Sequence, residues 1–146
     1  MFFFIACRKE DIKSNMKDPH LNIEQSALPH ANRYSGKVAT DWVKFQLPLT
    51  KTTPGFGPGT TGRAFAYIGL TAYESVVAGM PSYQSYIGSA AGIDIPVGKM
   101  KDYYWPASAN AALAEITRSL FAAASAQDKA SIDAFESANF ATYQSE

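Results

Sequence analysis

The first regular pattern of apolar side chains along the chain has the spacing of a helix. Its members are Val38, Trp42, Phe45 and Leu49. This spacing places them on one face of a helix that starts near Ser35 and is bent or ended by Pro48. Residues 43–49 also alternate as an edge strand would, but proline has no N–H to donate to a sheet, so the helix is favoured.

A run rich in glycine and proline follows this first helix. Residues 50–62 hold too many of these two residue types for a regular element, which predicts a loop. We expect the second helix to start with Thr60 or Thr61 accepting hydrogen bonds from the free N–H groups of its first turn, and to end at Gly79. Its small residues and nearly continuous apolar surface predict a central, buried helix.

Two further helices follow a long aromatic segment. Residues 79–106 mix glycine and proline with tyrosines and a tryptophan, which predicts an irregular segment that packs onto the body as a lid. The third helix is expected to open at Ala107 or Ser108. The fourth follows Ser125, because Ser125 and Asp128 have the spacing of a capping box in which Asp replaces Glu. The whole pattern predicts an all-α fold, a helical bundle of about four helices.

The last helix has no stop signal of its own. Residues 140–146 contain no glycine, asparagine or proline and no basic last turn. We therefore expect the chain to be an incomplete fragment of a larger bundle. The apolar stripes of the second and last helices would then leave an apolar face exposed, through which the chain would meet the missing helices or a second copy of itself.

The region ahead of the helices divides into two parts. Residues 8–34 are mostly polar without a sustained period, which predicts a flexible tether before a helical domain at residues 35–146. Residues 1–7 form a short apolar run that ends in Ala6 and Cys7 and resembles the end of a bacterial lipoprotein signal peptide. One interpretation is lipidation of Cys7, which would attach the chain to a membrane outside the cytoplasm. The other is an apolar N-terminus with an unmodified thiol, since the run is short and nothing basic precedes it.

Composition narrows the classes of partner. Apolar residues make up 47% of the chain and charged residues 18%, which is typical of a folded body, and no apolar run reaches the roughly 20 residues of a membrane span. The chain contains 13 Lys plus Arg and 13 Asp plus Glu, so its formal net charge is zero. No net electrostatic field therefore favours nucleic acid as a partner. The single cysteine excludes an internal disulfide and a thiolate metal cluster.

Few polar residues are candidates for a site. Arg63, near the start of the second helix, and Glu74, on its otherwise apolar surface, predict a structural polar pair, although a backbone donor could also satisfy Glu74 and an anion could meet Arg63. His20 and His30 lie in the tether without further ligands, so no metal site is expected. Residues 57–62 fit G-x-G-x-x-G, but a helix precedes them where a nucleotide site needs a buried strand.

Four peptides spread over the helical region carry a family resemblance. They are residues 51–56 (KTTPGF), 63–77 (RAFAYIGLTAYESVV), 79–85 (GMPSYQS) and 104–113 (YWPASANAAL). In the same order, they resemble the N-terminal helical segment of the vanadium-dependent haloperoxidase and type 2 phosphatidic acid phosphatase superfamily. The resemblance implies an all-α fold. It also implies vanadate or phosphate in complete members, bound through three motifs nearer to their C-terminus.

None of these three motifs occurs in this chain. The arginines precede Lys9, Tyr34, Ala64 and Ser119, so there is no Arg-Pro, and none of them follows a serine, so there is no Ser-Arg pair. Both histidines, His20 and His30, directly follow a proline, so Pro-Ser-Gly-His is missing, and no histidine follows His30. The resemblance thus implies an inactive N-terminal scaffold, without catalytic, cofactor-binding or metal-binding residues, that packs around a C-terminal catalytic bundle. Whether the chain is part of an enzyme stays open. The alternative is a non-catalytic surface lipoprotein or binding module, whose aromatic segment would stack on a sugar or lipid.

Overall fold

The structure is a computed structural model that describes residues 30–93 and 103–144. Every regular element in these two ranges is helical, which confirms the all-α prediction. The elements are η1 (Ala31–Arg33), α2 (Lys37–Thr52), α3 (Pro58–Glu74), η2 (Val77–Gly79), α4 (Tyr86–Ala91), α5 (Trp105–Leu120) and α6 (Ala126–Tyr143). The predicted lipidation site Cys7, the tether up to residue 29 and His20 lie outside the described residues.

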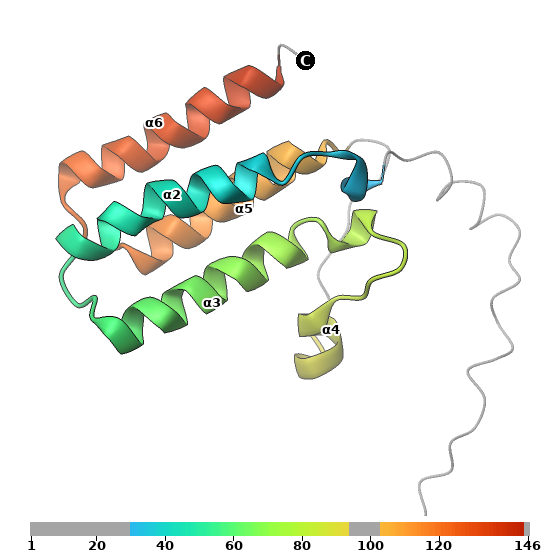
Figure 1. Cartoon of the computed structure of the whole chain (residues 1–146), viewed down its shortest axis with the longest axis horizontal. Coiled ribbons are helices and arrows are strands. Elements are labelled where there is room, and N and C mark those ends of the chain that lie inside the picture. Colours follow the sequence, from blue (N-terminus) through green and yellow to red (C-terminus); the bar gives the residue numbers. More distant parts are fainter. Residues whose placement is uncertain (1–29, 94–102, 145–146) are drawn as a thin grey trace, which may run out of the picture.

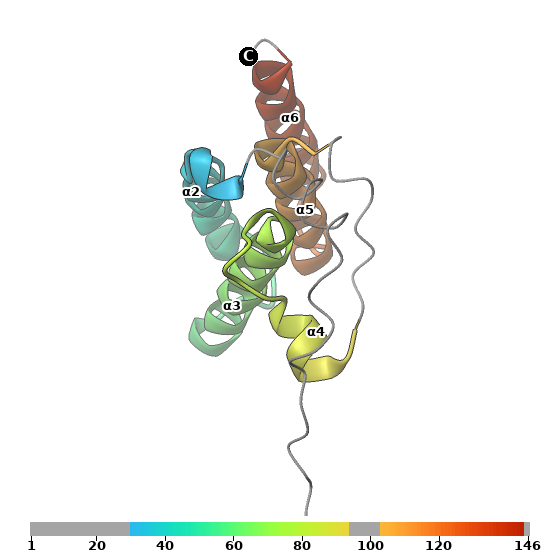
Figure 2. The same cartoon turned by 90° about the vertical axis from the view of Figure 1, so that its right-hand side faces the viewer.

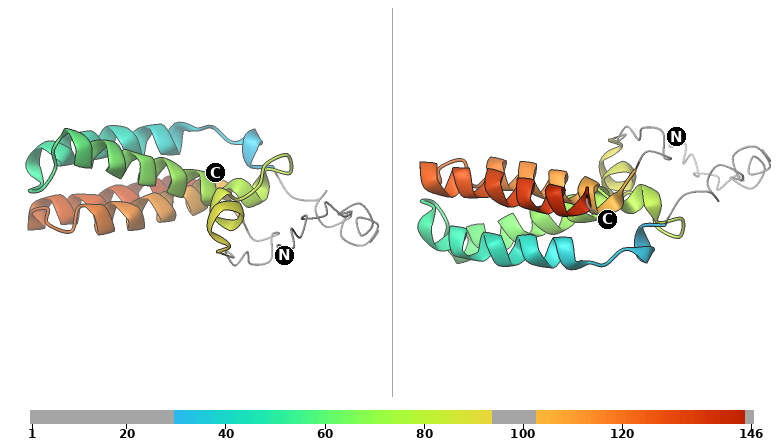
Figure 3. Two further views of the ribbon diagram at one scale, coloured as in Figure 1. Left: turned by 90° about the horizontal axis from the view of Figure 1, so that it is seen from below. Right: turned by 90° about the horizontal axis from the view of Figure 1, so that it is seen from above.

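Four long helices run up and down along one axis (Figure 1). The helices α2 and α5 begin, and α3 and α6 end, at the same end of the bundle, from which the short helix α4 projects (Figure 3). We call this the α4 end. The central helix is α5, which contacts α2, α3 and α6 (Figure 2). The predicted bundle of about four helices is therefore present.

The prediction that the second helix is the central, buried one is wrong. In α3 only Ala64 and Ile68 are buried, whereas seven residues of α5 are. Three other residues of α3, Ala66, Tyr67 and Gly69, are exposed. Small residues are compatible with either a close helix contact or an uncovered surface, so the composition of α3 alone did not distinguish the two.

Proline marks the start of α3 and is tolerated inside α2. The helix α3 begins at Pro58 after Gly57, and no side chain caps it, so the predicted threonine caps are wrong. Proline is favoured in a first helical turn because its missing N–H has no intrahelical partner there. Pro48 does not end α2, because the Thr53 N–H still donates to the carbonyl of Leu49 at 2.9 Å.

The last two helices begin differently. The helix α5 starts at Trp105, ahead of the predicted Ala107 or Ser108, because the proline that follows Trp105 again suits a first turn. The predicted cap of α6 is confirmed. Ser125 Oγ accepts a hydrogen bond from the Asp128 N–H at 3.0 Å and lies 2.8 Å from Asp128 Oδ2. Ser125 therefore satisfies a donor that the helix itself leaves free.

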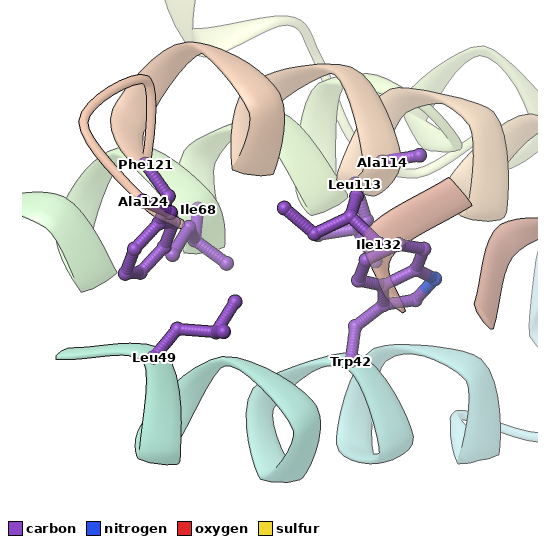
Figure 4. Close-up of a cluster of buried hydrophobic side chains, with 8 residues drawn as sticks. All are labelled: Trp42, Leu49, Ile68, Leu113, Ala114, Phe121, Ala124 and Ile132. Carbon is purple, nitrogen blue, oxygen red and sulfur yellow. The ribbon is translucent and has the colours of Figure 1, made fainter. Parts of the chain in front are cut away.

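Apolar side chains from all four long helices and the loop before α6 meet in one core (Figure 4). Its buried members are Trp42, Leu49, Ile68, Leu113, Ala114, Phe121, Ala124 and Ile132. Aromatic rings extend it: Phe45 and Phe135 stack with centroids 4.6 Å apart, and Trp42 meets both rings edge-on. Phe56, in the loop before α3, stacks on Phe121 at 4.6 Å. The apolar stripe predicted for the first helix faces this core.

Polar side chains inside the core pair across helices. Trp42 Nε1 donates to Asn110 Oδ1 at 2.8 Å, and Asn110 Nδ2 donates to the carbonyl of Glu136 at 3.0 Å. Gln46 Nε2 donates to Thr117 Oγ1 at 2.7 Å. Sliding α2 or α6 along α5 would break these hydrogen bonds. The buried polar groups would then be unpaired, which raises the free energy of the folded state. The hydrogen bonds therefore fix the register of three helices.

One close contact fixes the path of the chain after α3. Gly79 is buried in η2, and a Cβ atom placed on it would lie 2.3 Å from Cε2 of Trp105, whose side chain is also buried. The absence of a side chain at Gly79 thus lets the indole ring pack directly on the backbone. The second helix ends before this residue, at Glu74, and not at Gly79 as predicted.

Candidate functional site

The predicted pairing of Arg63 with Glu74 does not form. Both residues lie on α3, eleven positions apart, which separates them by about 16 Å along the helix axis. Glu74 Oε1 instead accepts hydrogen bonds from the backbone N–H groups of Tyr86 at 2.8 Å and Ile87 at 3.0 Å. This is the backbone-donor alternative for Glu74. The carboxylate ties the end of α3 to the first turn of α4.

Arg63 lies at the opposite end of the bundle. Its side chain lines a shallow hollow of about 190 Å³ together with Phe56, Thr60 and Tyr67. Within residues 30–93 and 103–144, no carboxylate forms an ion pair with it. Arg63 is therefore a solvated charge in the first turns of α3, and the structure contains no second cation beside it in this hollow.

The three arginines that the structure describes, Arg33, Arg63 and Arg118, do not converge on a vanadate or phosphate site. Such a site needs several donors directed at one oxyanion. Arg33 precedes α2 and Arg63 follows it, so the length of α2, about 24 Å, separates them. Arg118 is already engaged by carboxylates. The described residues thus do not fit the oxyanion that the family resemblance implies.

Arg118 forms the densest group of charges in the described chain. It donates to Asp133 Oδ1 from Nε at 3.0 Å and from Nη2 at 2.9 Å, and it also donates to Glu136 and lies 3.5 Å from Glu115. The hydrogen bonds with Glu136 and then Asp133 raise the pKa of Arg118 above its ordinary value. The cluster links α5 to α6 on the surface, and three carboxylates around one cation leave no attraction for an anion.

The described part of the chain has a cleft at the α4 end that sequence analysis did not identify. It measures about 320 Å³ and lies between the starts of α2 and α5 and the end of α6. Its lining includes three tyrosines and a charged or amide group from each of three further residues: Tyr34, Tyr104, Tyr143, Lys37, Asp41 and Asn139. Residues from three separate segments of the chain therefore meet at one place, and the volume is within the range of small-molecule sites.

The tyrosines of the cleft contact one another. The Tyr34 and Tyr104 rings meet edge to face, with centroids 5.3 Å apart and planes inclined by 82°. Tyr104 and Tyr143 lie 5.6 Å apart at 53°. Tyr34 was predicted to be the last residue of the tether. In the structure it is half-buried against the bundle, so the folded body begins before residue 35.

The polar side of the cleft is joined to the core. Asn139 Nδ2 donates to Asn110 Oδ1 at 3.1 Å, and the same oxygen accepts from Trp42. Lys37 Nζ and Asp41 form an ion pair one helical turn apart on α2. Only this spacing of Lys37 and Asp41 was visible in the sequence. The approach of Tyr34, Tyr104 and the end of α6 depends on the crossover between α3 and α5, which no local pattern encodes.

The aromatic segment predicted as a lid divides into two parts. Tyr103 stacks on Trp105 with centroids 5.1 Å apart, as packing onto the body requires. Tyr83 and Tyr86, in contrast, are 61% and 62% exposed on and before α4. Residues 94–102 of the segment lie outside the described residues.

Large apolar side chains also remain exposed on the outer faces of the long helices. They are Val43 and Leu47 on α2, Tyr67 on α3 and Phe140 on α6. Among the described residues, no group of three or more His, Cys, Asp or Glu is placed to hold a metal ion. None of the helices in the described ranges combines the length and apolar character that crossing a membrane requires.

Comparison with protein-family models, with curated proteins and with solved structures gives no match to this chain.

Proposed function

We propose that this chain is the N-terminal helical scaffold of a vanadium-dependent haloperoxidase-like or acid-phosphatase-like protein, and that it packs against a C-terminal catalytic bundle. The outer face of α3 carries this proposal. Gly62, Ala66, Tyr67 and Gly69 are all exposed, and a Cβ atom built on either glycine meets nothing within 4 Å. A glycine inside a helix costs about 1 kcal/mol relative to alanine, and no described neighbour makes use of the space. This face suits the close approach of another helix.

The family resemblance supports the choice of partner. The peptide of residues 63–77 that carries most of it includes this same face of α3. In the proposed assembly the catalytic bundle supplies the residues that hold vanadate or phosphate. The chain itself supplies packing surface and no catalytic or cofactor-binding residue. In this proposal the scaffold is inactive alone, because its described arginines do not converge and the sequence contains none of the three family motifs.

The proposal is tested by translating the DNA that follows the last codon, Glu146, in all frames and by expressing any helical product. We expect a segment that carries the three oxyanion-binding motifs and that binds this chain in gel filtration. Tyr67→Lys and Gly69→Leu on α3 should weaken the complex, whereas Ser137→Lys, on an exposed position of α6, should not. A downstream sequence without these motifs, or bromide oxidation or phosphatase turnover by this chain alone with vanadate, would overturn the proposal.

A second candidate function rests on α4. The exposure of Tyr83 and Tyr86 favours a surface binding module, held by a lipid on Cys7, that uses these rings to contact a sugar or lipid. This alternative predicts that a Tyr83→Ser, Tyr86→Ser double variant loses ligand binding while Tyr67→Lys keeps it. The scaffold proposal predicts instead that Tyr67→Lys weakens binding of the catalytic bundle, whereas the Tyr83→Ser, Tyr86→Ser double variant retains it.

A further inference from the structure

The cleft at the α4 end has the composition of a site for an organic cation. It combines tyrosine rings with a carboxylate, Asp41, whose partner Lys37 has an exposed side chain. We propose that this cleft binds a small organic cation with a quaternary ammonium group, such as choline. The inference is independent of the scaffold role, because the cleft lies at one end of the bundle and shares no residue with the outer face of α3.

The first step of the argument is the arrangement of the aromatic rings. Tyr34 and Tyr143 each contact the Tyr104 ring, with planes inclined by 82° and 53°, so the three rings form one continuous aromatic surface that lines the cleft. A cation within about 6 Å of an aromatic face is attracted by the ring quadrupole, by ~0.5–1 kcal/mol at exposed sites and more when desolvated. A quaternary ammonium group donates no hydrogen bonds and loses little by leaving water for such walls.

The second step is the charge in the cleft. The side chain of Asp41 is 27% exposed, whereas that of its partner Lys37 is 78% exposed. The carboxylate is thus largely buried in the wall, while Lys37, which also lines the cleft, pairs with it from the solvent side. A helix pair of this kind stabilises a protein by only about 0.3–0.5 kcal/mol. A ligand cation can therefore displace Lys37 from Asp41 at small cost.

The third step concerns the class of ligand. An anion would pair with Lys37 only by leaving the largely buried Asp41 carboxylate, which accepts hydrogen bonds and donates none, without its partner. A neutral sugar would bind without separating Asp41 from Lys37. A cation instead competes directly with Lys37 for Asp41. Its affinity should therefore fall when Asp41 loses its charge and rise when Lys37 loses its charge. The carboxamide of Asn139, held by Asn110 at 3.1 Å, is in position to contact a hydroxyl group beside the ammonium.

The experiment is a calorimetric titration of the full chain with choline, with tetramethylammonium, and with the neutral isostere in which a tert-butyl group replaces trimethylammonium. Both cations should bind and the isostere should not. Asp41→Asn should weaken choline about tenfold, because one charge contact at ~1.4 kcal/mol is lost. Lys37→Gln should tighten it about twofold, from the helix pair's ~0.3–0.5 kcal/mol. Tyr34→Phe should retain binding and Tyr34→Leu should lose it.

Circular dichroism of each variant separates a folding defect from a binding defect. Lys37 is the decisive position, because its exposed side chain can be replaced without loss of packing. Equal binding of choline and the isostere, binding of glucose in place of choline, no binding by the folded wild-type chain, or weaker binding by Lys37→Gln would each overturn the cation site. None of these results bears on whether the chain packs through α3.

Discussion

The indole N–H of Trp42 donates to Oδ1 of Asn110 at 2.8 Å between two side chains that are 0% and 1% exposed. The same oxygen accepts from Asn139, and the Asn110 amide donates to the carbonyl of Glu136. One carboxamide on α5 therefore holds α2 and α6 at once. Since the side chains of Trp42 and Asn110 are shielded from water, each must find its partner inside the protein.

Asn110→Ala should be strongly destabilising. It removes the shared acceptor and leaves the Trp42 indole N–H buried without a partner, which we expect to cost about 2–4 kcal/mol. Trp42→Phe removes the indole donor but retains the hydrogen bond from Asn139 to Asn110. The part of its destabilisation that comes from lost hydrogen bonding should therefore be smaller than in Asn110→Ala. Urea denaturation followed by circular dichroism measures both variants and the double variant. Costs that simply add would show that the two side chains are not coupled.

Gly79→Ala should destabilise the chain, whereas Gly62→Ala should not. The added methyl group at Gly79 would lie 2.3 Å from the buried Trp105 ring, and overpacking of this kind costs about 1–3 kcal/mol. At Gly62, within α3, a Cβ atom meets nothing within 4 Å, so alanine should stabilise the isolated chain by up to ~1 kcal/mol. Thermal denaturation gives the melting temperature of both variants. If both melting temperatures shift in the same direction, the direct packing of Trp105 on Gly79 is contradicted.

Glu74→Ala should release α4 without unfolding the bundle. It removes the acceptor for the N–H groups of Tyr86 and Ile87, which are then left without this bond. Hydrogen exchange resolved by residue should become faster across Tyr86–Ala91 and stay unchanged in α5. Arg63→Ala is the matched control. If it accelerates exchange in α4 as much as Glu74→Ala does, the two side chains act together after all.

Arg118→Gln should lower stability modestly, by about 0.5–1 kcal/mol, because the ion pairs with Asp133 and Glu136 are partly exposed. Molar salt should reduce the difference from wild type. The pKa of Arg118 is raised in the folded state, so this contribution is fully present below the ordinary pKa of arginine and declines only above it. The penalty should therefore be the same at neutral and moderately alkaline pH. A penalty unaffected by salt would point to packing of the arginine stem.

Patterns with a local cause could be predicted from this sequence. The helix stripe that includes Trp42 and the Ser125 cap depend on residues a few positions apart, and both are confirmed. The central position of α5 could not be predicted, because alanine and glycine residues make α3 look equally suited to burial. The cleft was missed for a similar reason. Tyr34 and Tyr143 are far apart in the sequence, and only the crossover between α3 and α5 brings both to Tyr104.

The central place of α5 has a consequence for synthesis on the ribosome. Trp42 and Gln46 find their partners Asn110 and Thr117 at separations of 68 and 71 residues. While α2 and α3 emerge alone, the polar groups of Trp42 and Gln46 lack these partners, and most of the core is missing because it comes from α5 and the segments after it. Native closure must wait until Leu120 has left the exit tunnel, and contacts of such long range form slowly. We therefore expect chaperones to bind the emerging α2 and α3 until α5 is complete.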